Sequence, residues 1–348
     1  MLADELDYVI GVDPHRDAHA LAVVEVRSGG VIFETDVVAN ESGYRAALSL
    51  VVDCAPGRRA FAVEGSGSFG AGLTRFLTAS GEQVFEVGRL RRERRSRGKT
   101  DALDAVRTAR SVLGQSQPAL PRAGAERDGL RALMVARESA LIAKKACLCQ
   151  LHALIVTCPE SLRAELTTLT RARLLARCAS LRPNQQKKRE LRGTLVALKS
   201  LANRTQTLTR EERELEREIS VLVDQLAPQL LDEQGVGPIS AAQLIVSWSH
   251  RGRVRNEAAF ARLAGVAPLP ASSGQTIRHR LSRGGDRQLN RALHTVILHR
   301  RQHDPTTRDY IARRVADGKT TREANRILKR YLARHLYRVM QNAGPAMT

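Results

Sequence analysis

Four acidic residues occupy positions from which they could bind divalent metal ions together. Asp13 and Glu64 each end an apolar run typical of a β-strand, and Asp101 and Asp104 lie three residues apart on one face of a predicted helix. A carboxylate at the end of a strand is held by a rigid backbone, so three elements could direct four oxygen ligands to one point. Hard cations such as Mg²⁺ prefer oxygen ligands, and this pattern is typical of a two-metal nuclease.

Each of these acids also has an ordinary structural explanation. Asp is common just after a strand, and Asp101 could simply favour the positive end of the helix that Thr100 would cap. Four acids in suitable elements and in a suitable order favour a metal site over four unrelated structural roles.

The composition favours a polyanionic partner. The 348 residues include 56 Lys and Arg against 36 Asp and Glu, and the resulting formal charge of +20 attracts nucleic acid or an anionic membrane. A membrane partner is disfavoured because no unbroken run of about 18 apolar residues occurs and the N-terminus lacks the pattern of a signal peptide. We therefore expect a cytoplasmic protein. The five cysteines lack the paired spacing of a disulfide framework or a zinc ribbon, which favours free thiols.

The first third of the chain predicts an α/β domain. The expected elements are strands at 8–12, 21–26 and 31–38, a helix at 41–54, a strand ending at Glu64, a helix at 70–80, a strand at 84–87 and a helix from near Thr100. Three strands followed by alternating helices and strands is the element order of the ribonuclease H-like fold. The acids would occupy its first strand, its fourth strand and a late helix.

A glycine-rich segment allows a competing interpretation. Residues 65–70, Gly-Ser-Gly-Ser-Phe-Gly, match G-x-G-x-x-G, and Glu86 lies near the acidic position of a dinucleotide-binding fold. However, Glu64 would place a negative charge beside the pyrophosphate, and the segment follows three meandering strands instead of opening a βαβ repeat. We favour glycines that let a substrate backbone approach Glu64.

The densest positive charge directly precedes the last two acids. Arginine side chains suit phosphate oxygens, so we expect this basic loop to bind nucleic acid, although a solvated charge run would have the same composition. Its cations are Arg89, Arg91, Arg92, Arg94, Arg95, Arg97 and Lys99.

The middle of the chain predicts long coiled-coil helices. Apolar residues recur every seven positions in two series, which are Met134, Leu141, Leu148 and Ile155, and Leu201, Leu208, Leu215 and Leu222. The two helices could pair within one chain or between two chains, because a heptad stripe does not identify its partner.

The last third predicts helices and further phosphate contacts. Residues 234–239, Gln-Gly-Val-Gly-Pro-Ile, resemble a helix-hairpin-helix turn, in which tightly turned glycines present backbone N–H groups to phosphate, although a plain loop remains an alternative. A stretch rich in Gly, Pro and Ser at 264–274 is followed by four more candidate nucleic-acid contacts: Arg278, Arg280, Arg283 and Arg287.

Nearly from end to end, these motifs resemble the DEDD transposases of the bacterial insertion sequence 110 family. Gly11-Val12-Asp13 and the segments at 63–67 and 99–105 resemble its three acidic motifs. The segments at 265–274 and 281–286 resemble its serine motif. One departure is Pro14-His15-Arg16, where family members often have small residues and a lysine.

The resemblance implies a domain organisation and a set of catalytic residues. It implies a ribonuclease H-like (RuvC-like) catalytic domain at 1–120, a coiled-coil region at 121–228 and a mainly helical C-terminal transposase domain at 229–348. Asp13, Glu64, Asp101 and Asp104 would bind Mg²⁺, and Ser273 would be the nucleophile that becomes joined to a DNA 5′-phosphate. Ser272 is the alternative nucleophile, but the position before the glycine favours Ser273.

The resemblance also implies the partners. Family members recombine donor and target DNA under the guidance of a structured noncoding RNA from their own element, so both DNAs and a guide RNA are expected. Because the acids and the serine lie in different domains, we expect domain docking and a homo-oligomer, either a dimer or a tetramer.

Two other functions fit the same residues. A RuvC-like Holliday-junction resolvase would use the acids with water as the nucleophile and would not need Ser273. A non-catalytic nucleic-acid scaffold would tolerate loss of the acids. Covalent trapping of protein on DNA separates these alternatives.

Overall fold

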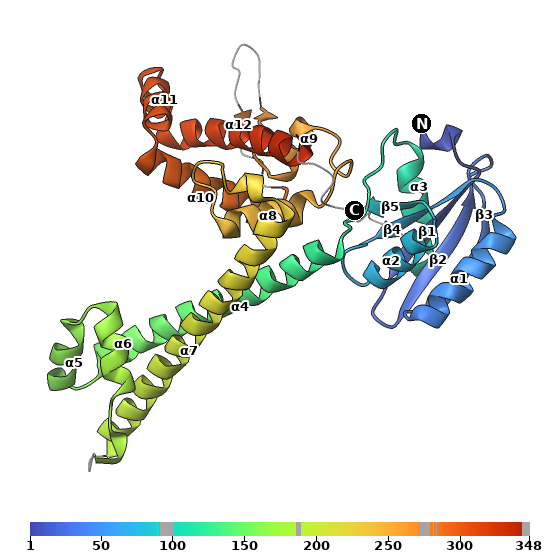
Figure 1. Ribbon diagram of the computed structural model, residues 1–348. Helices are drawn as coiled ribbons and strands as arrows, with labels where there is room; N and C mark the ends of the chain where they lie inside the picture. Colours follow the sequence, from blue (N-terminus) through green and yellow to red (C-terminus); the bar gives the residue numbers. More distant parts are fainter. Residues whose placement is uncertain are drawn as a thin grey trace. The chain divides into compact units, whose positions relative to one another are not determined.

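A computed structural model describes residues 1–88, 90, 101–185, 189–271, 279–280, 282 and 284–342 (Figure 1). It divides into two compact units, each treated separately below. Unit 1 comprises Met1–Ala123 and Ser249–Arg255, and unit 2 comprises Gly124–Trp248 and Asn256–Thr348. An α/β N-terminal region followed by mainly helical structure was expected from the sequence, and this is confirmed. The predicted site residues that lie outside the described residues are Arg89, Arg91, Arg92, Arg94, Arg95, Arg97, Lys99, Ser272, Ser273, Arg278 and Arg283.

Unit 1 is built on a five-stranded sheet with the strand order β3-β2-β1-β4-β5. Its strands are β1 (Tyr8–Pro14), β2 (Ala18–Glu25), β3 (Val31–Val38), β4 (Arg59–Glu64) and β5 (Val84–Val87). Strands β1, β2 and β3 form two antiparallel pairs, β1 with β2 and β2 with β3, while β4 is parallel to β1 and to β5. The mixed pattern places the ends of β1 and β4 at the same edge of the sheet.

Helices cover both faces of this sheet because successive strand residues point to opposite sides. Val9 belongs to the core cluster under α3 (Asp101–Leu113), whereas Ile10 belongs to the cluster under α1 (Glu41–Cys54) and α2 (Ala71–Ala79) (Figure 1). A 3-10 helix at Leu2–Asp4 precedes the sheet.

The face under α3 is lined by unusually small side chains. Ala20, Ala22, Ala60 and Ala62 are buried there with Gly11 of β1 between them. A Cβ atom on Gly11 would lie 1.9 Å from the backbone oxygen of Ala105 in α3. The helix therefore approaches the sheet more closely than any larger residue would allow. This close approach determines where the first turn of α3 sits relative to the end of β1.

The longest elements of unit 2 are α4 (Ala125–Thr157) and α7 (Arg189–Leu226), which pack against each other within the chain (Figure 1). Leu201, Leu208, Leu215 and Leu222 are only half-buried in this packing. The fully buried positions of α7 lie beside them, at Leu198, Ala202, Thr205, Ile219 and Val223. Between the helices, Arg137 pairs with Glu216 (Nη2 to Oε1, 2.6 Å) and Lys144 pairs with Glu212. By length and composition alone, α4 could cross a membrane, and only 22% of its apolar window is buried.

The remaining described elements of unit 2 are helices shorter than α4 and α7, together with one small hairpin. Between α4 and α7 lie α5 (Glu160–Thr167), α6 (Arg171–Ala179) and a 3-10 helix (Pro183–Gln185). After α7 follow a 3-10 helix (Pro228–Leu230), α8 (Pro238–Trp248), α9 (Glu257–Leu263), β6 (Leu269–Pro270), β7 (His279–Arg280), α10 (Arg287–His303), α11 (Pro305–Ala316) and α12 (Thr321–Asn342).

Candidate metal centre and serine segment

Asp13 and Glu64 end up beside each other at one edge of the sheet. Asp13 is the next-to-last residue of β1, and Glu64 is the last residue of β4. The two strands are parallel and in a register that pairs Val12 with Val63, so the next position on each strand carries an acid. Residues that are level on adjacent strands point to the same face, which places both carboxylates on one side of the sheet edge.

The first turn of α3 brings a third carboxylate to Asp13. Asp101 is the first residue of the helix, and ligand atoms of Asp13, His15 and Asp101 all lie within 4.8 Å of one another. The Nε2 atom of His15 lies 3.4 Å from Oδ2 of Asp13 and 3.2 Å from Oδ2 of Asp101. Two acids from different elements thus converge, as the sequence predicted, around a histidine that the sequence analysis noted only as a departure from the family.

The other two predicted ligands lie outside this three-residue cluster. Glu64 is half-buried beside Asp13 on the neighbouring strand. Asp104 is one turn along α3 from Asp101, and its Oδ1 accepts a hydrogen bond from Nη1 of Arg107 at 3.3 Å. Glu64 therefore lies on the strand next to the one that carries Asp13, and Asp104 lies one helical turn from Asp101 on the same helix.

The donor set of the cluster suits a divalent cation. Two aspartate carboxylates provide hard oxygen ligands of the kind that Mg²⁺ and Mn²⁺ take, while an imidazole nitrogen suits softer ions such as Zn²⁺. Asp13 is largely shielded, with 15% of its side chain exposed, and Asp101 is open to solvent, with 52% exposed. A cation held here would consequently contact the protein on one side and solvent on the other.

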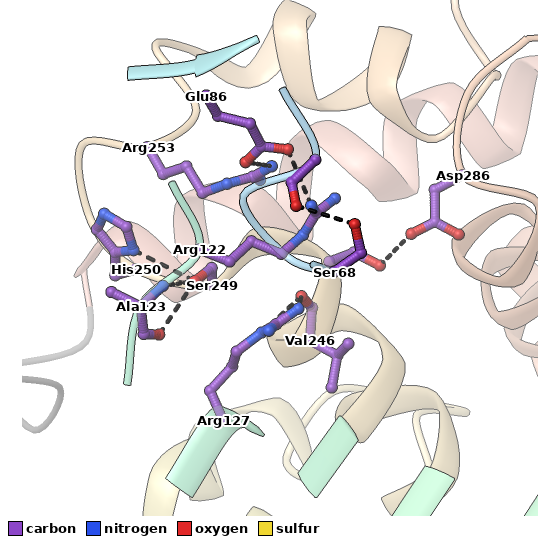
Figure 2. A network of polar contacts seen from close by, with 12 residues as sticks. Ser68, Glu86, Arg122, Ala123, Arg127, Val246, Ser249, His250, Arg253 and Asp286 are labelled. Atoms are coloured by element: carbon purple, nitrogen blue, oxygen red, sulfur yellow. Dashed lines mark hydrogen bonds and ion pairs between the residues drawn. The ribbon is translucent and has the colours of Figure 1, made fainter. Parts of the chain in front are cut away.

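Glu86, the acid that a dinucleotide-binding fold would use to bind a ribose, is paired with arginines in this structure. The carboxylate of Glu86 pairs with Arg122 (Oε1 to Nη1, 3.0 Å) and with Arg253 (Oε2 to Nη2, 3.5 Å), as Figure 2 shows. Arg253 is almost fully buried and comes from the segment Ser249–Arg255, which folds as part of unit 1. A carboxylate held by two arginines has a structural role, which weighs against the dinucleotide-binding interpretation.

The same part of unit 1 includes a second polar contact between distant segments. The Oγ of Ser249 donates a hydrogen bond to the backbone oxygen of Ala123 at 3.2 Å and accepts one from its backbone nitrogen at 3.1 Å (Figure 2). Ser249 is fully buried and has a φ of 76°, which is uncommon for a residue other than glycine. These contacts fix the segment Ser249–Arg255 to the end of the N-terminal part of the chain.

The segment that carries the predicted nucleophile is bounded by a two-stranded hairpin in unit 2. Leu269 of β6 pairs with Arg280 of β7, and Pro270 pairs with His279, in antiparallel register. Ser272 and Ser273 lie between these strands in the sequence and outside the described residues. The hairpin holds the two flanks of the serine segment next to each other.

Asp286 connects the end of the serine segment to the helices of unit 2. Its Oδ1 caps α10 by accepting hydrogen bonds from the backbone of Gln288 and Leu289 at 2.9 and 3.0 Å. Its Oδ2 accepts a hydrogen bond from Oγ of Ser247 at 2.6 Å, and Ser247 accepts one from Gln243 at 2.9 Å. Figure 2 includes Asp286 at this contact. The helix cap could have been read from the sequence, since an Asp that follows two glycines and precedes an apolar helical stripe is a typical N-cap.

Two close backbone contacts support the same region. Gly265 and Gly285 have positive φ angles of 65° and 90°, and a Cβ on Gly285 would lie 2.5 Å from the backbone oxygen of Leu263. Nδ2 of Asn290 donates a hydrogen bond to the backbone oxygen of Ala264 at 2.8 Å. Gly265 and Gly285 are therefore required by backbone conformation and by packing at the two ends of the serine motif.

The remaining predicted nucleic-acid contacts are placed as follows. The turn at 234–239 contains Gly235 with a φ of 79°, and α8 begins at Pro238. Arg280 ends β7, and Arg287 is exposed at the first position of α10.

Comparison with known proteins identifies matches over both units. Residues 10–159 match the family model for the DEDD transposases of IS110, and residues 227–312 match the family model described as "Transposase IS116/IS110/IS902 family". The first range includes all four candidate acids, and the second includes the serine segment. An "Insertion element IS110 uncharacterized 43.6 kDa protein" of Streptomyces coelicolor is 36% identical over 136 residues, which are 38% of this chain and 34% of the relative. The chain thus spans about a third of the length of the curated relative it matches.

Proposed function

Because the chain belongs to the IS110 family of DEDD transposases, we propose that it is the transposase of an insertion sequence and that it cleaves and rejoins DNA at a carboxylate-bound Mg²⁺ centre. One observation carries this proposal. Carboxylate oxygens of Asp13 from the sheet and Asp101 from α3 lie within 4.8 Å of each other, inside the segment that matches the DEDD family model.

We further propose that unit 1 has a ribonuclease H-like fold. The strand order β3-β2-β1-β4-β5, with three antiparallel strands followed by two parallel ones, supports this assignment. The proposed domains remain a catalytic domain at 1–120, a coiled-coil region at 121–228 and a transposase domain at 229–348.

The four acids would hold the metal. Asp13 and Asp101 supply oxygens that already converge, Glu64 ends the strand next to that of Asp13, and Asp104 lies on the same helix as Asp101. Mg²⁺ at this place supplies electrostatic stabilisation of the charge that develops on the scissile phosphate and favours deprotonation of the attacking hydroxyl. The close contact between Gly11 and α3 maintains the separation between the sheet acids and the helix acids.

We propose Ser273 as the nucleophile, with Ser272 as the alternative. Its Oγ attacks the scissile phosphorus and forms a phosphodiester between the serine and the 5′-phosphate. The bond from phosphorus to the 3′-oxygen breaks, and the released 3′-hydroxyl takes up a proton as the serine loses one. A 3′-hydroxyl of another strand then attacks the serine ester and frees the serine, so phosphodiester bonds are conserved in number.

The proposed partners are donor DNA, target DNA and a structured noncoding guide RNA, all bound in the cytoplasm by a homo-oligomer. The charge of +20 supports binding to nucleic acid. The cations proposed to contact phosphates are those of the basic loop at 89–99 together with Arg278, Arg280, Arg283 and Arg287.

The proposal is tested by trapping the covalent intermediate. Protein, the noncoding RNA of its own element and end-labelled donor DNA are incubated with Mg²⁺ and separated on a denaturing gel, and any shifted band is mapped to a peptide. Wild type should form an adduct on Ser273, while Ser273→Ala and Asp101→Asn should form none and still bind DNA. An adduct that persists in Ser273→Ala and disappears in Ser272→Ala moves the nucleophile by one residue. Cleavage by wild type without any adduct would establish the resolvase-like use of water in place of the proposed chemistry.

A further inference from the structure

Helix α4 carries an apolar stripe that faces solvent along most of its length. The stripe recurs with alternating steps of three and four residues, which is the spacing of a coiled-coil seam. Val135, Ile142 and Val156 are 60%, 62% and 66% exposed. We call this surface the exposed seam of α4, and its members, all exposed, are Ala132, Val135, Ser139, Ile142, Ala146, Cys149, Ala153 and Val156.

The exposed seam lies on the opposite side of α4 from its packing partner. Leu130, Ala140, Cys147 and Leu151 are buried on α4, and Arg137 pairs with Glu216 of α7. Each buried position is two residues away from a seam position, and two residues correspond to about 200° around a helix. The helix therefore has one seam that is covered within the chain and another that is not. Contiguous exposed apolar surface of this kind marks an interaction site.

The side chains of the exposed seam alternate in size. Every first position is small, at Ala132, Ser139, Ala146 and Ala153, and every second position is larger, at Val135, Ile142, Cys149 and Val156. In a parallel pair of identical helices, equal positions meet, so small layers leave voids and large layers hold the helices apart. In an antiparallel pair, each small residue meets a larger one.

One antiparallel register uses the whole seam. In this register the two-fold axis passes the helices at the level of Lys144. Four kinds of layer form, each twice, and they join Ala132 to Val156, Val135 to Ala153, Ser139 to Cys149, and Ile142 to Ala146 of the second copy. Every layer then has one small and one larger side chain, which keeps the distance between the helices constant. The surface is complementary to itself, as an isologous two-fold interface requires.

We propose that the exposed seam of α4 binds the same seam of a second copy of this chain in antiparallel orientation. The proposal deepens the proposed function, since it names the surface by which the homo-oligomer would form. It depends on the shape and polarity of α4 and not on the chemistry of the acids or the serine.

The charges around α4 make a lipid bilayer a poorer occupant than a second copy. Arg137 and Lys144 on α4 are paired with Glu216 and Glu212 of α7, and α7 carries further exposed acids at Glu211, Glu214 and Glu218. Insertion of α4 would have to carry α7 with it or break these pairs, and either would place charges in hydrocarbon. A second copy needs to cover only the apolar face.

The size of the seam predicts a modest affinity. From Ala132 to Val156 the stripe is about 36 Å long, and it is only one helix wide. Its area is therefore at or below the lower end of the range for specific protein interfaces. We expect a dimer that dissociates on dilution to micromolar concentrations, and one that other contacts reinforce when nucleic acid is bound.

Disulfide trapping of the full chain tests the orientation. Cys149 is the exposed cysteine of the chain, while Cys147, Cys158 and Cys178 are buried and Cys54 is half-buried. In the proposed pair, the two Cys149 residues lie about 15 Å apart along the axis, too far to form a disulfide. Ser139→Cys places its new thiol opposite Cys149 of the second copy, so mild oxidation should give a covalent dimer of this variant and none of wild type. A matched control is Val221→Cys, at an exposed position of α7, which should stay monomeric on a non-reducing gel.

Sedimentation of the same chain without nucleic acid tests the seam itself. Ile142→Glu places two charges near the axis and should raise the dissociation constant at least about tenfold. Val221→Glu, a substitution of similar exposure on α7, should leave it unchanged. The far-ultraviolet circular dichroism of both variants should match that of wild type.

Three results would overturn the proposal. They are a wild-type dimer crosslinked through Cys149, which means a parallel pair; sedimentation of Ile142→Glu like wild type together with no crosslink in Ser139→Cys; and seam-dependent flotation of the protein with vesicles. None of these results bears on the serine adduct. If the dimer is lost and DNA cleavage is retained, the proposed chemistry still stands. If cleavage is lost and the dimer is retained, the proposed interface still stands.

Discussion

Asp13 and Asp101 share one neighbour, the Nε2 atom of His15. This nitrogen lies 3.4 Å from the carboxylate of Asp13 and 3.2 Å from that of Asp101, so it occupies the space that joins the sheet acid to the helix acid. A cation bound by both carboxylates would compete with the imidazole for the same oxygens. Since Mg²⁺ prefers oxygen ligands and Zn²⁺ accepts imidazole, the histidine should affect the two ions differently.

The first prediction concerns this competition. His15→Ala should strengthen Mg²⁺ binding by up to about tenfold, or about 1.4 kcal/mol, and weaken Zn²⁺ binding. The measurement is the rise in melting temperature as each ion is added, because a ligand that binds only the folded state stabilises it. Asp13→Asn should abolish the Mg²⁺ effect, and Arg16→Ala, at a neighbouring exposed position, should not change it. Weaker Mg²⁺ binding in His15→Ala would instead assign the histidine to the ligand set.

The second prediction concerns the glycine that lets α3 approach the sheet. A Cβ on Gly11 would collide with the backbone oxygen of Ala105, so Gly11→Ala should force α3 away from β1. We expect a loss of about 1 to 3 kcal/mol in the free energy of unfolding, together with a weaker Mg²⁺ effect. Urea unfolding checks the first result. Gly114→Ala, where an added Cβ meets nothing within 4 Å, is the control, and equal losses in both variants would contradict the packing argument.

The elements of unit 1 could be predicted because their signals are local. Apolar runs and intervening helical stretches placed β1, β3, α1 and β5 within a few residues of their observed bounds. The meeting of Asp13 with Asp101 followed from strand ends and helix starts. The role of His15 did not follow, because it depends on the distance between β1 and α3, which is set by the small residues packed between them.

Local signals were less informative where packing selects small residues. The heptad spacing of Leu201, Leu208, Leu215 and Leu222 predicted that these leucines form the packing face of the helix. The buried face of α7 instead includes Ala202 and Thr205. A heptad pattern judged by hydrophobicity favours the largest side chains. The face of α7 that packs against α4 instead includes small side chains, because these allow the two helices to approach closely. Glu86 illustrates the same limit, since its partner Arg253 is far away in the sequence and could not be inferred from spacing.

The third prediction concerns the basic loop. Replacing Arg91, Arg92, Arg94 and Arg95 by Ala should flatten the dependence of DNA affinity on salt, by about 0.7 to 0.9 in log–log slope for each lost phosphate contact. Fluorescence anisotropy at several salt concentrations measures the slope. The control variant replaces Arg27, Arg45, Arg58 and Arg75 by Ala, which removes the same net charge from unit 1. Equal slopes in the two variants would mean that only net charge matters.

The fourth prediction concerns a buried histidine in β2. His19 is fully buried, its ring stacks on Tyr44 with centroids 5.7 Å apart, and its Nε2 has no hydrogen-bond partner among the described residues. Burial lowers the pKa of His19 below its ordinary value of 6.5, and the nearby His15 lowers it further, while the hydrogen bond between Nδ1 and the backbone oxygen of Ala18 acts in the opposite direction. As the pH falls, His19 therefore takes up a proton at a higher pH in the unfolded chain than in the folded chain.

The sign of the pH effect follows from that order. The contribution of neutral His19 to the free energy of unfolding is fully present above about pH 6.5. It decreases as the pH drops below this value towards the lower pKa of the folded state, with a slope of at most about 1.4 kcal/mol per pH unit. His19→Phe keeps an aromatic ring against Tyr44 and removes the titrating group, so its unfolding free energy should depend less on pH between about pH 7.5 and about pH 5. Urea unfolding of both proteins across this range, without divalent ions, makes the comparison. If the two curves remain parallel, protonation of His19 does not differ between the folded and unfolded states, and the buried ring contributes to the fold only through its packing.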